Sequence, residues 1–355
     1  MIFRQLFDTT SSTYTYLLGC EETREAIIID TVFERHDRDA ALVRELGLDL
    51  RYVLDTHVHA DHVTGAWLMK EAFGAVIAGS SHSGAKCLDV ALSHRHTIKF
   101  GKYAIEARET PGHTEGCMTY VTADHSMVFT GDCLLIRGAG RTDFQGGDVR
   151  RMWHSIRVEI FSLPDDCVVY PAHDYSGRTS STVGEEKRFN PRIGGEAQEE
   201  DFIGYMNNLG LPHPAQIDIA VPANLQCGQP DPEHRHELPA WGPVELTFAG
   251  VPEIVPEWVA AHRDAVYILD VRGEDEFAGS LGRLEGSHCV PLDQLRDRLD
   301  DVPRDRPVVT VCQSGKRSAM AVTILKGAGW TDVANIRGGL LEWHKHALPL
   351  AGGPG

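Results

Sequence analysis

Short apolar runs, most of them rich in β-branched residues, recur along the chain and are separated by segments with mixed, helix-like patterns. Six of these runs are residues 26–30, 52–55, 127–130, 168–170, 266–269 and 308–311. Near-continuous apolar strands of this kind fit a sheet that is covered on both faces. The pattern therefore predicts an α/β protein built from layers of helices and sheets.

A stretch rich in proline, glycine and polar residues interrupts this pattern at about residues 222–243. Because such a composition is typical of a linker, we expect one domain over residues 1–240 and another over residues 246–355. A chain of 355 residues is long enough for about two domains that each bury a core. His234 and His236 lie in this stretch, where a solvated linker is a better interpretation than a metal site.

Seven His and Asp side chains follow strand-like runs in the first domain. They are His57, His59, Asp61 and His62 in the segment THVHADH, and His113, Asp132 and His173 further along. Ligands at several strand ends converge on one rim of a sheet, where α/β proteins usually place their sites. Neutral imidazoles and carboxylates facing one cavity can hold a metal ion, so the set predicts a metal site. The residues alone leave open which of the seven bind the metal.

At these residues the first domain resembles the metallo-β-lactamase fold, an αββα sandwich. Three segments narrow the resemblance to the persulfide dioxygenase branch, the ethylmalonic encephalopathy protein family. They are FTGDCLLIRGAGRTDF at 129–144, YPAHDY at 170–175 and NPRI at 190–193. The resemblance covers roughly residues 1–230. The main alternative is glyoxalase II, a dinuclear thioester hydrolase of the same superfamily, because all seven ligand positions are present.

The resemblance implies one iron ion per chain, held by His57, His113 and Asp132. Two His and one carboxylate with open positions suit a non-haem Fe(II) centre that uses dioxygen. Zinc has no accessible redox change and cannot do this chemistry. The other candidates would surround the iron without binding it: His59, Asp61, His62 and His173.

The resemblance also implies a substrate, glutathione persulfide, which dioxygen would oxidise to sulfite and glutathione. Tyr175 and Arg192 match positions that hold glutathione in the family, and an Arg can clamp a carboxylate through two parallel hydrogen bonds. Arg141 and Asp143 lie in the characteristic loop of the family, where we expect a structural ion pair.

The second candidate site is Cys312, in the segment VCQSGKRS at residues 311–318. It lies between a buried-looking strand and a helical pattern that ends near Gly327 or Gly329. Backbone N–H groups and the positive end of the helix would favour the thiolate form of the cysteine. Lys316 and Arg317 add two positive charges beside it.

This loop resembles the active-site loop of the rhodanese (sulfurtransferase) family, as do the segments 269–277 and 337–343. The resemblance covers about residues 246–350 and implies a doubly wound parallel α/β domain. Catalysis would be covalent: Cys312 takes a sulfane sulfur and passes it on, while Lys316 and Arg317 stabilise an anionic donor such as thiosulfate. A Cys-x5-Arg phosphatase loop is disfavoured, because only four residues separate Cys312 from Arg317.

The two resemblances support each other, because glutathione persulfide can connect the two reactions. A rhodanese can make it from thiosulfate, or consume it with sulfite, and a persulfide dioxygenase consumes it. Together they imply a bifunctional enzyme of sulfur metabolism with small-molecule substrates. The alternative for the second domain is a binding or regulatory module, but such modules usually lack the cysteine.

The charge composition limits the partners and substrates that this protein can bind. With 51 acidic and 34 basic residues the net charge is −17, so we expect no nucleic-acid partner. Residues from Leu246 onward have 12 Lys and Arg against 15 Asp and Glu, a net of −3, which leaves −14 in residues 1–245. An anionic substrate of the first domain therefore needs local cations such as Arg192.

Eight cysteines are too few for a disulfide scaffold. The N-terminus has no secretory pattern, and no apolar run approaches the ~20 residues needed to cross a bilayer. We therefore expect a cytoplasmic protein with no membrane partner and with reduced thiols, of which Cys312 is the reactive one. A homo-oligomer is compatible with the sequence.

Overall fold

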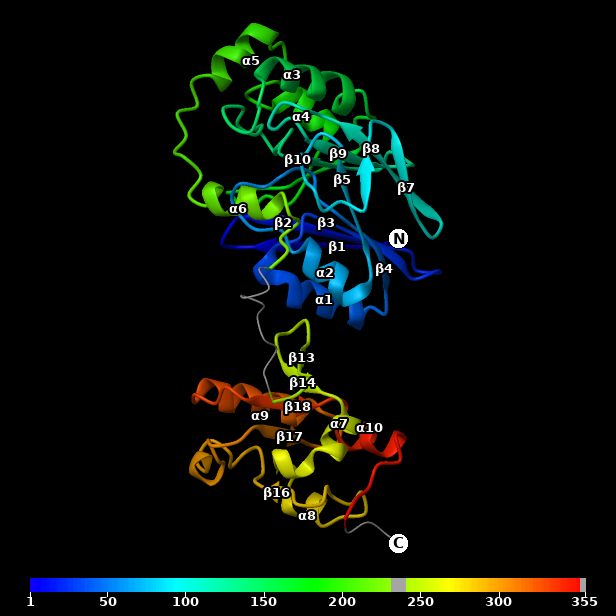
Figure 1. Ribbon diagram of the computed structural model, residues 1–355, viewed down its shortest axis with the longest axis vertical. Helices are drawn as coiled ribbons and strands as arrows, with labels where there is room; N and C mark the ends of the chain where they lie inside the picture. The colour runs from blue at the N-terminus through cyan, green and yellow to red at the C-terminus, as the bar shows by residue number, and fades with distance from the viewer. Residues whose placement is uncertain (231–240, 352–355) are drawn as a thin grey trace. The chain divides into compact units, whose positions relative to one another are not determined.

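Strand β3 (Glu25–Ile29) shows why the first part of the chain forms stacked layers. Its side chains alternate between two buried clusters, with Ile27 and Ile29 in one and Ala26 and Ile28 in the other. A strand buried on both faces must be covered on both faces. The computed structural model describes residues 1–230 and 241–351, and it has a second sheet on one side of β3 and helices on the other (Figure 1).

By its internal contacts the chain divides into two units, Met1–Pro230 and Asp231–Gly355. The first unit holds two six-stranded sheets. The first sheet has the order β1-β2-β3-β4-β5-β6, with β1 Ile2–Asp8, β2 Thr13–Gly19, β4 Asp49–Leu54, β5 Val76–Ser80 and β6 Val90–Leu92. The second has the order β12-β11-β10-β9-β8-β7, with β7 His96–Phe100, β8 Tyr103–Glu109, β9 Met118–Thr122, β10 Met127–Gly131, β11 Val168–Pro171 and β12 Ser181–Thr182. Both sheets are mixed, because β3 to β6 run parallel, β10 pairs with β11 in parallel, and the other pairs are antiparallel.

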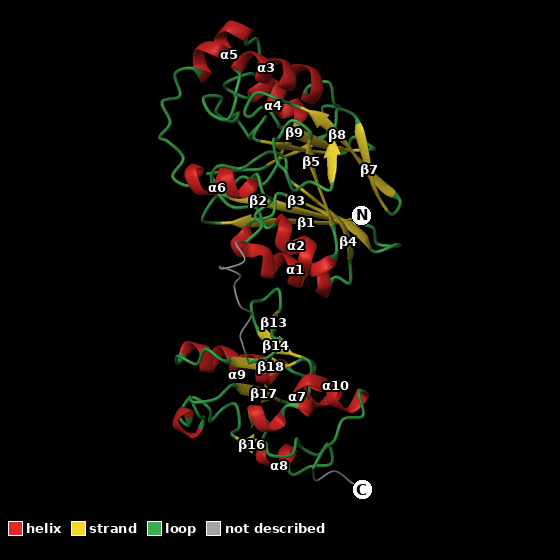
Figure 2. Cartoon of the chain, viewed as in Figure 1, coloured by secondary structure: helices red, strands yellow, loops and turns green. Residues whose placement is uncertain are grey.

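Helices form the outer layers of this unit (Figure 2). α1 (His36–Glu45) and α2 (Ala66–Phe73) pack on the first sheet, through the cluster that includes Leu42, Val43 and Met69. The second sheet is covered by α3 Val149–His154, the π-helix Ser155–Ile160, α4 Val183–Phe189 and α5 Glu199–Met206. An aromatic-rich core lies between the sheets. These layers confirm the predicted αββα sandwich.

The second unit is built on one sheet of order β13-β14-β18-β17-β15-β16. Its strands are β13 Glu245–Leu246, β14 Pro252–Ile254, β15 Tyr267–Asp270, β16 His288–Cys289, β17 Val308–Val311 and β18 Val333–Ile336. All pairs are parallel except the edge pair β13–β14. Its helices are α7 Pro256–Ala261, α8 Glu274–Phe277, α9 Lys316–Gly327 and α10 Gly339–Lys345.

Side chains of strand β17 contribute to the two buried clusters of this unit, one on each face of the sheet. Val308 belongs to a cluster on one face of the sheet, and Val309 and Val311 belong to a cluster on the other. The predicted α/β fold is confirmed, and α9 ends at Gly327, one of the two glycines expected to end it. None of the helices in the described ranges is both long and apolar enough to cross a membrane.

The structure differs from the predicted linker at its start. Residues 222–224 belong to α6 (Ile217–Asn224), although Pro222 marks the segment as a break by composition. Ala220 and Asn224 are buried in this helix, so tertiary packing decides the local structure there. Residues 231–240, with His234 and His236, lie outside the described residues.

The prediction that all thiols are reduced is wrong for two cysteines. Cys87 and Cys227 form a disulfide with a Cα–Cα distance of 5.9 Å. They are 140 residues apart in the sequence, so cysteine density could not indicate the pairing. The other six cysteines, which all lie in the described ranges, are free.

Candidate metal centre and thiol site

Three loops bring the predicted metal ligands together in the first unit. His57 follows β4, His113 follows β8, and Asp132 follows β10. One ligand atom from each lies within 4.8 Å of the others, which is the spacing that one metal ion needs. Nε2 of His113 is 3.8 Å from Oδ2 of Asp132. The geometry therefore groups these three residues, which the resemblance had selected from seven candidates.

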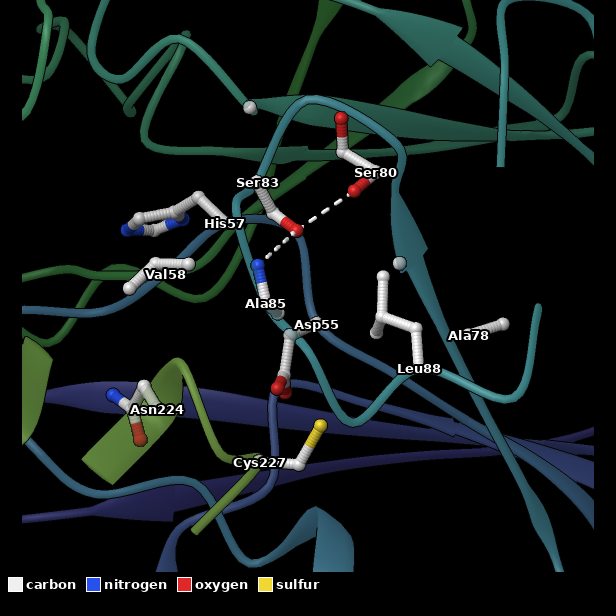
Figure 3. A pocket seen from close by; sticks show the side chains of 12 residues that line it. Asp55, His57, Val58, Ala78, Ser80, Ser83, Ala85, Leu88, Asn224 and Cys227 are labelled. Carbon is white, nitrogen blue, oxygen red and sulfur yellow. Dashed lines mark hydrogen bonds between the residues drawn. The ribbon is translucent and has the colours of Figure 1, made fainter. Parts of the chain in front are cut away.

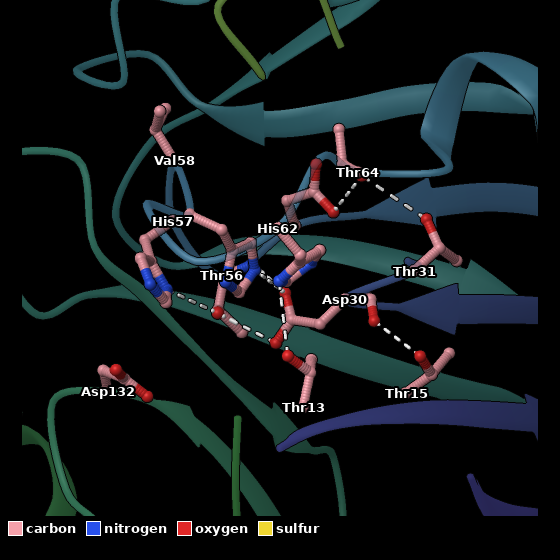
Figure 4. Close-up of polar contacts among 12 residues, drawn as sticks. Thr13, Thr15, Asp30, Thr31, Thr56, His57, Val58, His62, Thr64 and Asp132 are labelled. Carbon is pink, nitrogen blue, oxygen red and sulfur yellow. Dashed lines mark hydrogen bonds and ion pairs between the residues drawn. The ribbon is translucent and has the colours of Figure 1, made fainter. Parts of the chain in front are cut away.

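Neighbouring groups assign the protons on both imidazoles. The backbone carbonyl of Arg141 accepts a hydrogen bond from Nδ1 of His113 at 2.6 Å. The hydroxyl of Thr56 donates its proton to the carboxylate of Asp30 at 2.9 Å, so it accepts from Nδ1 of His57 at 3.0 Å (Figure 4). Both Nε2 atoms are thereby left with lone pairs that can bind a metal ion.

The burial of His57 also suits a metal ligand. Removal from water lowers its pKa well below the ordinary value, and the neighbouring His59 lowers it further. The imidazole is therefore neutral, which is the form that coordinates a metal. Two imidazoles and one carboxylate form a donor set that fits a non-haem metal such as iron.

His173 lies between two carboxylates. Its Nδ1 is 2.7 Å from Oδ1 of Asp132 and its Nε2 is 3.0 Å from Oδ2 of Asp61. Burial lowers the pKa of His173, but the charges of Asp132 and Asp61 outweigh this and raise it well above the ordinary value. The contact through Nδ1 orients the carboxylate of Asp132.

A second set of potential ligands adjoins the first. Ligand atoms of His59, Asp61, His62 and His173 also lie within 4.8 Å of one another. Among the described residues, Nδ1 of His59 and Nε2 of His62 are buried and have no hydrogen-bond partner. This donor set fits a second ion, so the geometry leaves the dinuclear alternative open.

Of the two predicted glutathione-binding residues, Tyr175 lies against His173, and Arg192 lies against the loop that follows Asp132. The ring of Tyr175 is 72% exposed and stacks on that of His173 at a centroid distance of 6.2 Å. The guanidinium of Arg192 donates to the carbonyl of Ala139 and lies 5.3 Å from the ring centre of Tyr205. Arg192 is thus held against the loop that follows Asp132.

Arg141 and Asp143 form a two-fold ion pair in that loop, with N–O distances of 2.7 and 2.8 Å. Arg141 also donates to the carbonyl of Pro212 at 2.7 Å. The backbone carbonyl of Arg141 also accepts from Nδ1 of His113. Arg141 therefore connects its loop both to a candidate metal ligand and to the chain at Pro212.

Sequence reasoning missed two residues of this site, Asp30 and Asn224. Asp30 accepts from both the backbone and the hydroxyl of Thr56, and Asn224 binds the backbone of the ligand segment. Asp30 follows an apolar run as the ligands do, so the same rule could have found it. Asn224 gave no comparable indication, because it lies in a segment interpreted as the start of a linker.

The thiol site lies in the turn between β17 and α9. Cys312 is buried, and both the backbone N–H and the hydroxyl of Ser318 donate to its Sγ, at 3.5 and 3.3 Å. Burial raises the pKa of the thiol, but these bonds and the N–H groups of Ser314 and Arg317 lower it below the ordinary value. Gly315 closes the turn with a φ of +84°, which side chains other than glycine rarely adopt.

The two cations beside Cys312 differ in their surroundings. Lys316 is exposed, whereas Arg317 forms a two-fold ion pair with Glu276, with N–O distances of 2.6 and 2.7 Å. The charge of Arg317 is therefore partly compensated. Glu276 was not among the predicted site residues, although it lies in one of the segments that carry the rhodanese resemblance.

Two protein families match the chain in separate regions. The metallo-beta-lactamase superfamily matches residues 8–173, and the rhodanese-like domain matches residues 255–346. The human protein named persulfide dioxygenase ETHE1, mitochondrial, is 52% identical over 233 residues, which are 65% of this chain and 91% of the human protein.

Two solved structures are also similar to this chain. The crystal structure of ETHE1 from Myxococcus xanthus is 50% identical, with a TM-score of 0.62, and covers 64% of this chain and all of the Myxococcus chain. A metallo-beta-lactamase from Staphylococcus aureus covers 95% of this chain and 98% of its own, with a TM-score of 0.60. At 23% identity the latter shows the fold alone.

Proposed function

Since the chain belongs to the persulfide dioxygenase family and also carries a rhodanese-like domain, we propose that it is a bifunctional enzyme of sulfur metabolism. The first unit converts glutathione persulfide, dioxygen and water into glutathione and sulfite. The second unit transfers sulfane sulfur between thiosulfate and glutathione. The observation that carries the proposal is the grouping of His57, His113 and Asp132. Hydrogen bonds from Nδ1 of both imidazoles leave each Nε2 available to bind a metal ion.

One Fe(II) ion at these residues would supply the redox chemistry by which dioxygen reacts with the persulfide sulfur. The surrounding residues keep the ligands in place. His173 holds the Asp132 carboxylate through Nδ1, and Arg141 holds the His113 ring through its backbone carbonyl. Such neighbours typically change metal affinity or activity by about 10- to 100-fold when removed.

Arg192 and Tyr175 would bind the glutathione part of the substrate. The first domain is acidic, so an anionic thiol needs a local cation, and the guanidinium of Arg192 lies against the loop that follows Asp132. Tyr175 presents an exposed ring beside His173. We assign Arg192 to a carboxylate of the substrate and Tyr175 to the wall of its pocket.

Cys312 would carry sulfur in the second unit. Its thiolate attacks the outer sulfur of thiosulfate, an S–S bond forms on Cys312, and sulfite leaves with the electron pair of the broken bond. A glutathione thiolate then attacks that outer sulfur, which yields glutathione persulfide and restores the Cys312 thiolate. The bonds from Ser318 to Sγ support this role because they stabilise the thiolate.

The second candidate function is that of a dinuclear thioester hydrolase similar to glyoxalase II. The unpartnered buried nitrogens of His59 and His62 favour it, because they complete a second donor set. Metal analysis together with oxygen uptake on glutathione persulfide separates the two functions. Two zinc ions per chain, with thioester hydrolysis and no oxygen uptake, would replace the dioxygenase by the hydrolase.

Replacing the sulfur of Cys312 tests the transferase half. We predict that Cys312→Ser abolishes sulfur transfer from thiosulfate, because a hydroxyl cannot hold a sulfane sulfur. Oxygen uptake with glutathione persulfide is expected to stay at the wild-type rate, which serves as the control for folding. Transfer activity near that of the wild type would exclude Cys312 as the nucleophile.

A further inference from the structure

Asn224, at the end of α6, binds the backbone of the segment that carries the metal ligands. Its Nδ2 donates to the carbonyls of His59 at 2.9 Å and His62 at 2.8 Å, and its Oδ1 accepts from the N–H of Thr64 at 2.8 Å. Both donors of the amide and its acceptor are used, and the side chain is buried. One side chain therefore holds the path of the chain through residues 59–64.

The end of α6 is itself attached to the rest of the unit. The disulfide joins Cys227 to Cys87, and the carbonyl of Leu225 accepts from the N–H of Lys86 at 3.0 Å. The carbonyl of Cys227 accepts from the N–H of Trp67, in the first turn of α2, at 3.1 Å. The covalent bond thus fixes the segment that positions Asn224.

Cys227 of the disulfide and the candidate ligand His57 line one cavity. A space of about 20 Å³, enough for about one water molecule, is lined by His57, Asn224 and Cys227 among others (Figure 3). Gly228 lies directly against the ligand segment, since a Cβ there would be 1.9 Å from the carbonyl oxygen of Thr64. A shift of the chain near Cys227 would therefore displace the backbone of residues 59–64.

We propose that Asn224 is a positioning residue of the metal centre and that the Cys87–Cys227 disulfide holds it in place, so that thiols weaken metal binding when they reduce this bond. The inference rests on the metal site of the proposed function. It does not depend on the reaction that takes place there.

The reducing step is thiol–disulfide exchange. A thiolate attacks Sγ of Cys87, which is only partly buried, and Cys227 leaves as a thiolate. A second thiol attacks the mixed disulfide and releases Cys87, so the two small thiols leave as their disulfide. Two electrons and two protons pass to the protein. Glutathione, which the proposed dioxygenase releases, is a thiol of this class.

The first test measures Co(II) binding to the full chain without oxygen, by competition with a coloured chelator and by the visible absorption of bound Co(II). Asn224→Ala is expected to weaken binding by about 10- to 100-fold and to change the absorption spectrum. Asn224→Asp keeps the acceptor but loses both donors, so it should weaken binding as well. Asn208→Ala, at an exposed asparagine after α5, is the matched control and should match the wild type.

The second test reduces the disulfide with a water-soluble phosphine, which takes oxygen from water and is removed before the titration. Reduced wild type is expected to bind Co(II) as weakly as the double variant Cys87→Ser with Cys227→Ser. The phosphine should have no effect on that variant. Alkylation before and after reduction counts the free thiols, which should rise from six to eight.

Three results would overturn the inference. One is wild-type Co(II) affinity and spectrum in a folded Asn224→Ala variant. Another is unchanged affinity after the disulfide is reduced or removed. The third is eight free thiols before any reduction. If the wild type itself binds no Co(II), the metal site of the proposed function fails instead.

Discussion

Ser318 donates two hydrogen bonds to the sulfur of Cys312, one from its backbone and one from its hydroxyl. The sequence pointed to Cys312 through its place between a strand and a helix, and to Lys316 and Arg317 through their charge. In the structure the lowered pKa of Cys312 comes from hydrogen-bond donors that outweigh burial. The sequence predicted backbone N–H donors at this turn, but it did not indicate the hydroxyl of Ser318 as a further donor to the sulfur.

Removing the hydroxyl of Ser318 is expected to raise the pKa of Cys312, because that bond stabilises the thiolate and not the thiol. The thiolate fraction at a given pH then falls, and the pH at which Cys312 becomes reactive rises. The pH dependence of Cys312 alkylation in Ser318→Ala measures this shift. Ser314→Ala is the control, since its backbone N–H remains. A profile of Ser318→Ala equal to that of the wild type would contradict the assignment.

The ion pair between Arg317 and Glu276 has a consequence for donor binding. An anionic donor competes with Glu276 for the guanidinium. Glu276→Gln removes the competing charge, so we expect a KM for thiosulfate that is a few-fold lower, with a smaller change in kcat. Steady-state kinetics check this, with Glu274→Gln on the same helix as control. A higher KM would mean that Glu276 is needed to position Arg317.

At the scale of elements, the most apolar strands were predictable and contacts between distant segments were not. The six apolar runs located β3, β4, β10, β11, β15 and β17, because a strand covered on both faces needs apolar residues at successive positions. The ligands followed from their places after β4, β8 and β10. Asn224 could not be found in this way, since the residues that it binds lie 160 to 165 positions earlier in the chain.

The disulfide between Cys87 and Cys227, just after the end of α6, is expected to stabilise the first unit. It closes a loop between residues 140 positions apart, and removing such a bond typically costs about 2–4 kcal/mol. We expect the variant with both Cys87 and Cys227 changed to Ser to unfold its first unit at lower guanidinium concentration. The transition of the second unit serves as the internal control. An unchanged transition of the first unit would mean that the bond adds nothing to its stability.

At the scale of the whole molecule, the chain combines two units with different chemistry. The first is acidic and holds a metal-ligand set, and the second holds a buried cysteine in a strand–helix turn. In the proposed function, glutathione persulfide is the product of one unit and the substrate of the other.

The central claim is that the first unit is an iron-dependent persulfide dioxygenase. Its most direct test measures the metal content of the full chain together with oxygen uptake and sulfite formation on glutathione persulfide. We predict one iron ion per chain, one dioxygen consumed for each sulfite formed, and no oxygen uptake once the iron is removed. Two zinc ions per chain, with thioester hydrolysis in place of oxygen uptake, would contradict it.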